Sequence, residues 1–415
     1  MKAGAASVDV TPHWPVQLAG FSSRGGLPTD ECAAPIHVRA VVLESRSGSE
    51  RICIMSAELL NWPREREQEH RRIVAHAAGV DPGNVILCAT HNHSAPQPNT
   101  TCCPSMGVAD GRFLESFTNS LVEAAQAAAD RLEEVVARRN TIDHDLGRQR
   151  RIIIDGAVTT GTNLLGPDDS ALTVVGFYDV HDRIIAGFVH YTCHAVVSAE
   201  NVISGDFPGY ACSILEQALG GVFLYLQGCC GDINPGSFTT AGIIEAERVG
   251  RGLAASARRA LDGATSLGRD IFSSEFSEVA LPMIHDLAEC DDEKDGRLID
   301  EWRTTMAAHP ERVRGAESLT IRVLHITEDF GLVSMNGELS VEYGLTVRRL
   351  SGGRLLPVAY SDGMIGYVPR QHQLLEGGYE PVQAAYYYGL AGRFSPGIEK
   401  SIDGALAGVS GLLRG

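Results

Sequence analysis

The segment from Val85 to Pro96 joins an apolar run to two closely spaced histidines. It reads VILCATHNHSAP, so His91 and His93 follow a strand-like stretch at positions i and i+2. On an extended backbone this spacing places both imidazoles on one face. Neutral imidazole nitrogens are frequent ligands of zinc-like ions, so the pair indicates a metal site at the end of a buried strand. The alternative is that both side chains cap the strand end through hydrogen bonds.

A second apolar run, Ile184 to Val197, carries His190 and His194. On a continuous strand these two side chains share a face but stand about 13 Å apart, which is too far for one ion. Only one of them is therefore expected at a metal site. His194 lies where the strand pattern gives way to a loop, and it is the better candidate.

Glycine-rich segments place further polar groups beside apolar runs. The loops Ser204 to Tyr210 and Leu226 to Pro235 each contain a Gly-Asp pair, which favours an oxyanion-binding backbone or an ordinary turn. Glu338 follows an apolar strand and a glycine, at a position that also suits the first turn of a helix. The segments Tyr360 to Pro369 and Glu376 to Pro381 place aromatic residues beside glycines, a pattern also typical of loop packing.

The composition narrows the class of protein. The chain has 415 residues, of which 44% are hydrophobic and 21% charged, and its formal net charge is −17. This charge argues against binding to nucleic acid or to anionic lipid surfaces, because both require clustered basic residues. No apolar run reaches the roughly 18 to 20 residues that a membrane-spanning helix needs, so stable membrane anchoring is not expected. The N-terminus lacks an apolar signal segment, which predicts a cytoplasmic protein.

The cysteines and the acidic stretch do not indicate additional metal sites. Ten cysteines occur without any CxxC motif, and their apolar contexts predict reduced, buried thiols. The polar stretch Asp286 to Arg314 contains CDDEKDG from Cys290, which is either an acidic cation site or a solvated surface helix. The helix is the preferred interpretation.

Strand and helix patterns alternate along the whole chain. Strand-like runs occupy 38–43, 52–55, 85–88, 172–178, 184–190, 222–226, 319–325 and 332–335. Helical periodicity occupies 64–78, 112–132, 210–218, 243–261, 292–306 and 398–413. The alternation predicts an α/β (mixed α+β) fold in which helices cover β-sheets. Strand patterning lapses between 265 and 315, which leaves a possible seam there.

Taken in order, these motifs resemble the neutral/alkaline non-lysosomal ceramidase family, and in particular its short bacterial members. The matching motifs are THNHSAP, the strand ending in His194, SGDFPGY, QGCCGDINP, NGE and GYVP followed by GGYE. Near the N-terminus, Val8 to Pro12, Ala19 to Phe21 and Pro35 to Ala40 match as well. The resemblance covers about residues 5 to 395. It implies one large catalytic domain over 1–415, like the N-terminal domain of the neutral ceramidases.

The resemblance also implies a set of site residues. Family members hold one catalytic zinc ion through two histidines, a glutamate and a tyrosine, which correspond here to His91, His194, Glu338 and Tyr367. The other histidine of the pair, His93, then faces the substrate. Tyr379 stands twelve residues after Tyr367, as a second family tyrosine does, and faces the tetrahedral centre. The arginine that binds the substrate carbonyl corresponds to Arg150, with Arg148 and Arg151 as alternatives.

Two departures from the family affect the expected substrate. Asn234 occupies the position at which ceramide-cleaving members carry a serine, so a serine-dependent step is excluded and Asn234 is expected to donate a hydrogen bond to the substrate. The secreted members also carry a signal peptide and a C-terminal immunoglobulin-like domain, and neither is evident in this sequence. A small soluble amide, an N-acyl amine or an ester is therefore at least as plausible a substrate as ceramide.

Together the residues predict a zinc-dependent hydrolase of a carbon–nitrogen bond. Zinc lowers the pKa of bound water towards 7, and His93, Tyr379 and Arg150 would stabilise the developing oxyanion. Protonation of the departing nitrogen would come from His93 or Tyr379. The alternatives are a zinc esterase or lactonase on the same scaffold, an amidohydrolase-type barrel, and a non-catalytic metal-binding protein. Manganese, iron or cobalt would accept the same ligands, and the sequence assigns no oligomeric state.

Overall fold

The computed structural model describes residues 1–236, 241–287 and 296–410. The acidic run from Cys290 to Asp295 lies outside these residues, and so does its interpretation as a cation site. The helix expected in the same polar stretch is present as α5 (Gly296–Ala308). Within the described part of the chain, no helix combines the length and the apolar character needed to cross a membrane.

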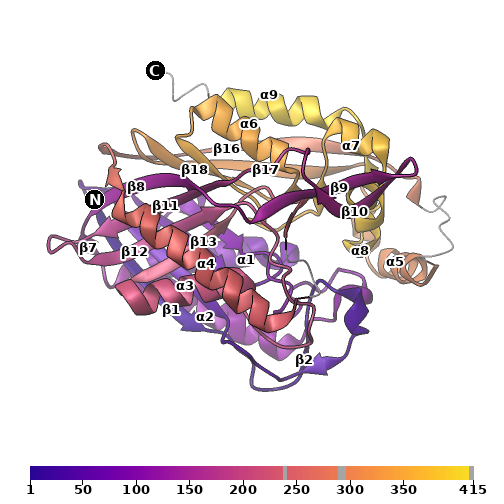
Figure 1. Ribbon diagram of the computed structural model, residues 1–415, viewed down its shortest axis with the longest axis horizontal. Helices are drawn as coiled ribbons and strands as arrows, with labels where there is room; N and C mark the ends of the chain where they lie inside the picture. Colours follow the sequence, from indigo (N-terminus) through magenta and orange to yellow (C-terminus); the bar gives the residue numbers. More distant parts are fainter. Residues whose placement is uncertain (237–240, 288–295, 411–415) are drawn as a thin grey trace.

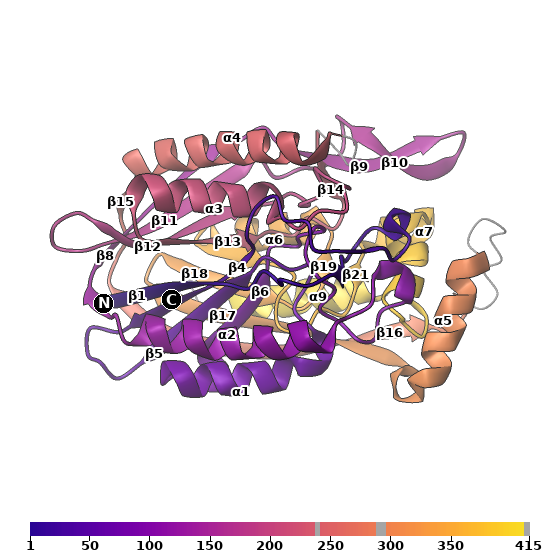
Figure 2. The same ribbon diagram turned by 90° about the horizontal axis from the view of Figure 1, so that it is seen from below.

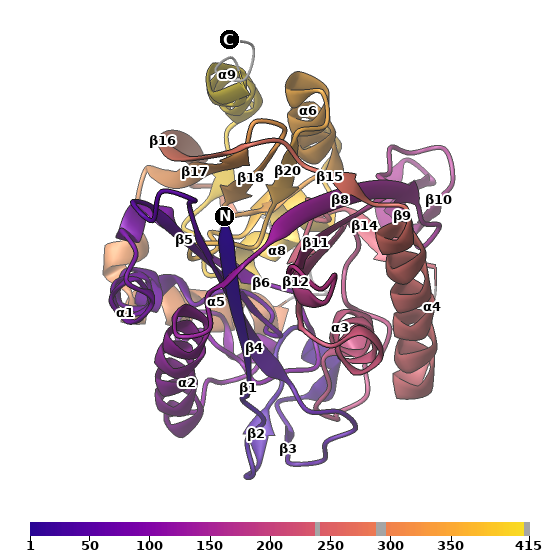
Figure 3. The ribbon, with the colours of Figure 1, turned by 90° about the vertical axis from the view of Figure 1, so that its left-hand side faces the viewer.

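Three five-stranded sheets form the body of the molecule, and two helices cover the outer face of each (Figure 3). The first sheet has the order β6-β5-β4-β1-β7. Its strands are β1 (Lys2–Asp9), β4 (His37–Glu44), β5 (Arg51–Ala57), β6 (Val85–Ala89) and β7 (Glu133–Glu134). Helices α1 (Glu67–Ala78) and α2 (Gly111–Ala129) pack on it through an apolar cluster that includes Val74, Phe113 and Phe117.

The second sheet repeats this arrangement with the order β13-β12-β11-β8-β15. Its strands are β8 (Val136–Asp143), β11 (Ala171–Tyr178), β12 (Ile184–Tyr191), β13 (Val222–Gln227) and β15 (Thr265–Ser266). Helices α3 (Asp206–Leu219) and α4 (Gly242–Asp262) cover it, and they lie opposite α1 and α2 across the molecule (Figure 2).

The third sheet, of order β20-β18-β17-β16-β22, lies beneath the C-terminal helices (Figure 1). Its strands are β16 (Asp270–Ile284), β17 (Ala316–Thr327), β18 (Phe330–Met335), β20 (Leu355–Val358) and β22 (Arg393–Phe394). Helices α6 (Val341–Ser351) and α9 (Ile398–Ser410) cover it. The inner faces of all three sheets contribute to one apolar cluster, in which Ile54, Phe188 and Leu324 are fully buried. Burial on both faces explains why these strands read as continuous apolar runs.

Each large sheet contains one parallel pair of strands, and these pairs organise the site. The pairs are β5 with β6, β12 with β13, and β18 with β20, while the other strand pairings within the three sheets are antiparallel. The chain leaves β6 towards His91, β12 towards His194 and β18 towards Glu338. The three sheets therefore deliver one predicted ligand each from the carboxyl end of a strand, where loops are free to build sites.

Two small ladders complete this end of the molecule. β9 (Gly147–Ile154) pairs with β10 (Ala157–Asn163) and with β14 (Ile233–Pro235). β19 (Glu338–Leu339) runs parallel to β21 (Tyr367–Val368). Three helices lie at the same end as the β9–β10 hairpin (Figure 1): α5 (Gly296–Ala308), α7 (Gln371–Glu376) and α8 (Ala384–Tyr387).

The predicted fold class is confirmed, since helices cover mixed β-sheets throughout, and each predicted strand-like run overlaps a strand of the structure. Strand patterning does not lapse over the whole of 265–315, because β16 pairs with β17 from Asp270 to Pro282 and belongs to the third sheet. The strand escaped detection because polar and charged residues, such as Ser274, Glu275 and Glu278, interrupt its apolar positions.

Candidate active site

Three predicted ligands meet at one point between the sheets. The Nε2 atom of His91 lies 3.1 Å from Oε1 of Glu338, and the Nε2 atom of His194 lies 2.9 Å from the same oxygen. All three side chains are at most 1% exposed. Residues separated by more than 200 positions in sequence therefore present three ligand atoms to a single buried point.

In the neutral form of each histidine, the hydrogen bonds place the proton on Nδ1 and make Nε2 an acceptor. Nδ1 of His91 lies 2.7 Å from the Leu60 carbonyl oxygen and Nδ1 of His194 lies 3.1 Å from that of Ile233, so each Nδ1–H donates to a carbonyl. Burial, reinforced by the charge of Arg150, lowers the pKa of His194 to about 4, which keeps this imidazole neutral near pH 7. Two nitrogen lone pairs and a carboxylate oxygen thus converge. Such a set of acceptors fits a bound cation, and the outward Nδ1–H bonds are typical of metal-binding histidines.

The backbone at His91 differs from the expected extended conformation. β6 ends at Ala89, and His91 adopts φ of 60°, which is in the left-handed region. The side chains of His91 and His93 are consequently brought together by a turn of the backbone. They do not lie on one face of an extended strand. Strained backbone of this kind costs roughly 1–3 kcal/mol and persists where the surroundings enforce it.

His93 touches this cluster from one side. Its Nε2 atom lies 3.2 Å from Nε2 of His91, and the ligand atoms of His91, His93 and His194 all lie within 4.8 Å of one another. Burial holds the pKa of His93 well below its usual value. The buried Nδ1 atom of His93 has no hydrogen-bond partner among the described residues. The arrangement therefore allows His93 to serve either as a further ligand or as a group that faces the substrate.

The segment between β2 (Val16–Gln17) and β3 (Pro28–Thr29) holds His93 in place. Arg24, which is buried, donates to the carbonyl oxygens of His93 (2.5 Å), Ala19 (3.0 Å) and Glu200 (2.9 Å). The ring of Phe21 lies 4.9 Å from that of His93. Gly20 has φ of 94°, and a Cβ atom there would stand 2.3 Å from Nδ1 of His93, so the close approach requires glycine.

Glu338 and Tyr367 are register partners in the parallel β19–β21 ladder. Glu338 does not start a helix, as its position suggested, because α6 begins at Val341, whose N–H donates to Asp232 at 2.8 Å. The hydroxyl of Tyr367 lies 3.3 Å from Nε2 of His194. Tyr388 donates to the second oxygen of Glu338 at 3.0 Å. The fourth predicted ligand therefore borders the cluster, and Tyr388 fixes the orientation of the carboxylate.

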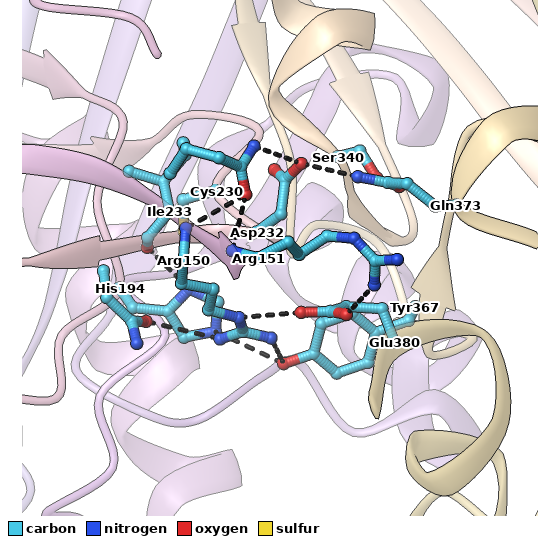
Figure 4. A network of polar contacts seen from close by, with 12 residues as sticks. Arg150, Arg151, His194, Cys230, Asp232, Ile233, Ser340, Tyr367, Gln373 and Glu380 are labelled. Carbon is cyan, nitrogen blue, oxygen red and sulfur yellow. Dashed lines mark hydrogen bonds and ion pairs between the residues drawn. The ribbon is translucent and has the colours of Figure 1, made fainter. Parts of the chain in front are cut away.

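Of the three candidate arginines, Arg150 faces the cluster (Figure 4). It donates to the Tyr367 hydroxyl at 3.1 Å, and its Nη1 lies 3.3 Å from both Nε2 of His194 and Oδ1 of Asn234. Arg148 instead pairs with Asp145 at the surface. Arg151 pairs with Glu376 and Glu380. The structure therefore places Arg150, Asn234 and Tyr367 in one group.

Tyr379 borders the same group. Its ring lies 5.5 Å from that of Tyr367, and the guanidinium of Arg150 lies 5.6 Å from its ring centroid. His190, by contrast, lies away from the cluster, where it contacts the Pro357 carbonyl oxygen (2.6 Å) and Arg348 (3.3 Å). All eight residues predicted for the site are thus brought together, and His190 is left out.

Sequence reasoning did not single out Asp232, Glu380 or Tyr388. Asp232 is fully buried and accepts from Gln149 (2.9 Å), Gln373 (2.8 Å) and the N–H of Val341. Asp232 thereby connects the segments that carry Arg150, Glu338 and Tyr367 through hydrogen bonds. A usable signal was the run of arginines from 148 to 151, because buried arginines require nearby carboxylates, and GGYEP and GDINP supply them.

The comparisons with known proteins agree with this fold. No protein-family model matches the sequence, and no curated protein sequence matches it. Among solved structures, neutral ceramidase from Pseudomonas aeruginosa superimposes with a TM-score of 0.77 at 18% identity, over 100% of this chain and 74% of that chain. A ceramidase complexed with C2 gives a TM-score of 0.78 at 16% identity, over 100% and 75%. At these identities the likeness concerns the fold, and at that level it confirms the predicted resemblance.

Proposed function

We propose that this protein is a zinc-dependent hydrolase that cleaves the carbon–nitrogen bond of a small amide or N-acyl amine. The observation that carries the proposal is the convergence of two imidazole Nε2 atoms and one carboxylate oxygen on a buried point. The structural neighbours that carry the name ceramidase support amide hydrolysis as the reaction class.

In this proposal His91, His194, Glu338 and Tyr367 hold the ion. Their atoms suit zinc, which favours nitrogen and oxygen donors in a compact arrangement. A bound zinc ion would lower the pKa of water towards 7 and polarise a carbonyl group. Burial of the ligands strengthens such electrostatic effects, because bulk water is excluded from the site.

The residues around the cluster would manage charge and protons during hydrolysis. Water adds its oxygen to the acyl carbon, the carbon–nitrogen bond breaks, and the departing nitrogen gains a proton. Arg150 offers N–H donors to the negative charge that develops on the acyl oxygen. Asn234 directs Oδ1 to Arg150, which leaves its Nδ2 free to donate to the substrate. His93 or Tyr379 supplies the proton to nitrogen.

The expected substrate is smaller than membrane ceramide. Asn234 stands where ceramide-cleaving relatives carry serine, and an amide side chain cannot act as a hydroxyl nucleophile. Hydrolysis here therefore relies on activated water. Activated water can attack any acyl amide that reaches the site, so the mechanism does not require ceramide.

The test is a hydrolysis screen over N-acyl amines, simple esters and lactones. We expect zinc-reconstituted protein to cleave N-acyl amines, and we expect a chelator to abolish this activity and added zinc to restore it. Turnover of esters or lactones alone would favour the esterase alternative. No turnover of any compound by fully zinc-loaded protein would favour a non-catalytic metal-binding role.

A further inference from the structure

Arg150 is held by a buried carboxylate that has no other evident task in the site. Nε of Arg150 donates to Oε1 of Glu380 at 2.8 Å, and Arg151 pairs with the other oxygen, Oε2 (Figure 4). The two arginines and Glu380 are 6%, 8% and 4% exposed. Glu380 thus bridges two consecutive arginines of β9 away from bulk water.

The geometry separates the two ends of the Arg150 guanidinium. Glu380 takes the Nε–H, whereas Nη1 and Nη2 point to His194, Asn234 and Tyr367. An arginine side chain is long and has several rotamers, so an anchor on Nε fixes where the two terminal nitrogens lie. Glu380 therefore determines the direction of the donors that the site uses.

The ion pairs that Arg150 and Arg151 form are balanced in charge. Arg150 and Arg151 carry two positive charges, and Glu376 and Glu380 carry two negative charges. Glu376 reaches only the outer side of this network, with its side chain 37% exposed and 3.0 Å from Arg151. The neutralisation of Arg150 consequently depends on Glu380, which is the carboxylate in direct contact with it.

Charge balance matters because of the difference between an amide and its hydrolysis product. The substrate acyl group is an uncharged carbonyl, whereas the product is a carboxylate. A buried arginine without a counter-ion would bind that carboxylate through charge-assisted, often bidentate, hydrogen bonds. An arginine that is already paired acts mainly as a hydrogen-bond donor. The pairing should therefore reduce the preference of the site for its own anionic product.

We propose that Glu380 is a positioning residue that directs Arg150 into the site and cancels its charge, so that the site accepts uncharged acyl groups and releases carboxylates. The substrates would then be acyl amides without a carboxylate near the scissile bond. This inference rests on the proposed function, because it assigns a role to Arg150 in acyl binding.

The test measures binding to metal-free protein, so it does not depend on turnover. Hexanoate and hexanamide serve as a matched pair of anionic and neutral probes, with dissociation constants measured by ligand-observed NMR. We expect wild-type protein to bind the two with similar affinity. Glu380→Gln should bind hexanoate at least about tenfold more tightly while hexanamide affinity changes far less, as expected for a newly unpaired arginine.

Glu376→Gln is the matched control, because it makes the same change in net charge at the other end of the network. We expect its preference for hexanoate over hexanamide to equal that of the wild type. If Glu380→Gln shows no gain in this preference, or if Glu376→Gln shows the same gain, the proposal is overturned. A merely structural role for Glu380 would weaken both probes together and leave their ratio unchanged.

Two measurements keep the proposal open to refutation if Glu380→Gln does not fold. Wild-type protein that binds hexanoate more than about tenfold more tightly than hexanamide contradicts a neutralised Arg150. Glu380→Asp retains the charge, so its hexanoate preference should stay near that of the wild type, and a large gain would contradict the proposal. Failure of the hydrolysis screen with these binding results intact would refute the proposed function and leave the charge pairing established.

Discussion

Two buried polar regions lie side by side in this molecule and differ in how their groups are satisfied. We call the first the acceptor cluster, which consists of His91, His194 and Glu338. We call the second the arginine network, which consists of Arg150, Arg151, Gln149, Asp232, Gln373, Glu376 and Glu380. In the network each carboxylate meets donors from within the chain. In the cluster two lone pairs and a carboxylate oxygen face one another.

The difference shows which region is built for the fold and which for a ligand. A buried network with satisfied hydrogen bonds adds to stability and fixes geometry. Converging acceptors destabilise a folded protein unless a metal ion, a proton or another donor joins them. Destabilising arrangements of this kind are typical of functional sites. Mutations in the arginine network should therefore lower stability. Mutations in the acceptor cluster should instead lower metal binding or turnover.

The largest effect is expected from His93→Ala. His93 contacts the cluster, but its Nδ1 has no partner among the described residues, which suits a group reserved for the substrate. We expect turnover to fall by about 10²- to 10⁴-fold, the usual contribution of a positioned acid or base, while zinc content is retained. Kinetics and metal analysis of the same preparation check this. Loss of zinc together with turnover would show that His93 is a ligand.

In the arginine network, Asp232→Asn should act mainly on stability. The substitution turns one acceptor oxygen into a donor that faces donors from Gln149, Gln373 or Val341. We expect the free energy of unfolding to fall by about 2–3 kcal/mol, as for a buried group that loses its hydrogen bonds. Urea denaturation of metal-free protein measures it. A change below 0.5 kcal/mol, the ordinary range for a surface substitution, would contradict the assignment.

In the acceptor cluster, Glu338→Gln should give the opposite result. We expect zinc affinity to fall by at least about tenfold, the low end of the loss seen when a mere hydrogen-bond partner of a ligand is removed. Metal-free protein should keep its stability or gain some, because the new amide donates to a histidine Nε2. Chelator competition and thermal melting give the two values. Undiminished zinc affinity would remove Glu338 from the ligand set.

A smaller effect is expected at His70, a buried histidine that has partners for both ring nitrogens. Trp62 Nε1 lies 3.2 Å from its Nδ1, and Thr118 Oγ1 lies 3.2 Å from its Nε2. Burial, with the charge of Arg66, lowers the pKa of His70 from 6.5 to about 4. In this window the unfolded chain binds the proton and the folded chain does not, so stability falls as pH drops from 6.5 towards 4.

His70→Gln should remove this contribution. We expect the loss of unfolding free energy between pH 7 and pH 5 to shrink by about 1–2 kcal/mol relative to wild type. Urea denaturation at the two pH values measures the difference. An unchanged pH dependence would mean that folding does not lower the pKa of His70, and the contrast with the acceptor cluster would be weakened.

The sequence predicted the members of the site better than their contacts. His91, His194 and Glu338 follow apolar runs that are easy to read, because both faces of those strands are buried. Tyr367 lies in a glycine-containing segment and was identified through the family motif. The order of the motifs linked them to one family, and the fold comparison agrees. The roles of all eight predicted site residues, the identity of the metal and the single domain over 1–415 stay predictions.

What the sequence did not reveal depends on long-range pairing. Glu380 meets Arg150 across 230 positions, and Tyr388 meets Glu338 across 50, so no local pattern joins them. The left-handed backbone at His91 is imposed by its surroundings and not by the preference of histidine. β16 was missed because polar and charged residues interrupt its apolar positions, although its pairing with β17 is extensive.

The most direct test of the account is the zinc content of the purified protein beside that of His91→Ala. His91 is fully buried, and its Nε2 faces Glu338. We expect elemental analysis to find about one zinc ion per wild-type chain after zinc loading and removal of free metal, and close to none in the variant. Equal zinc content in the two proteins, with the variant folded, would contradict the central claim that this cluster is a metal site.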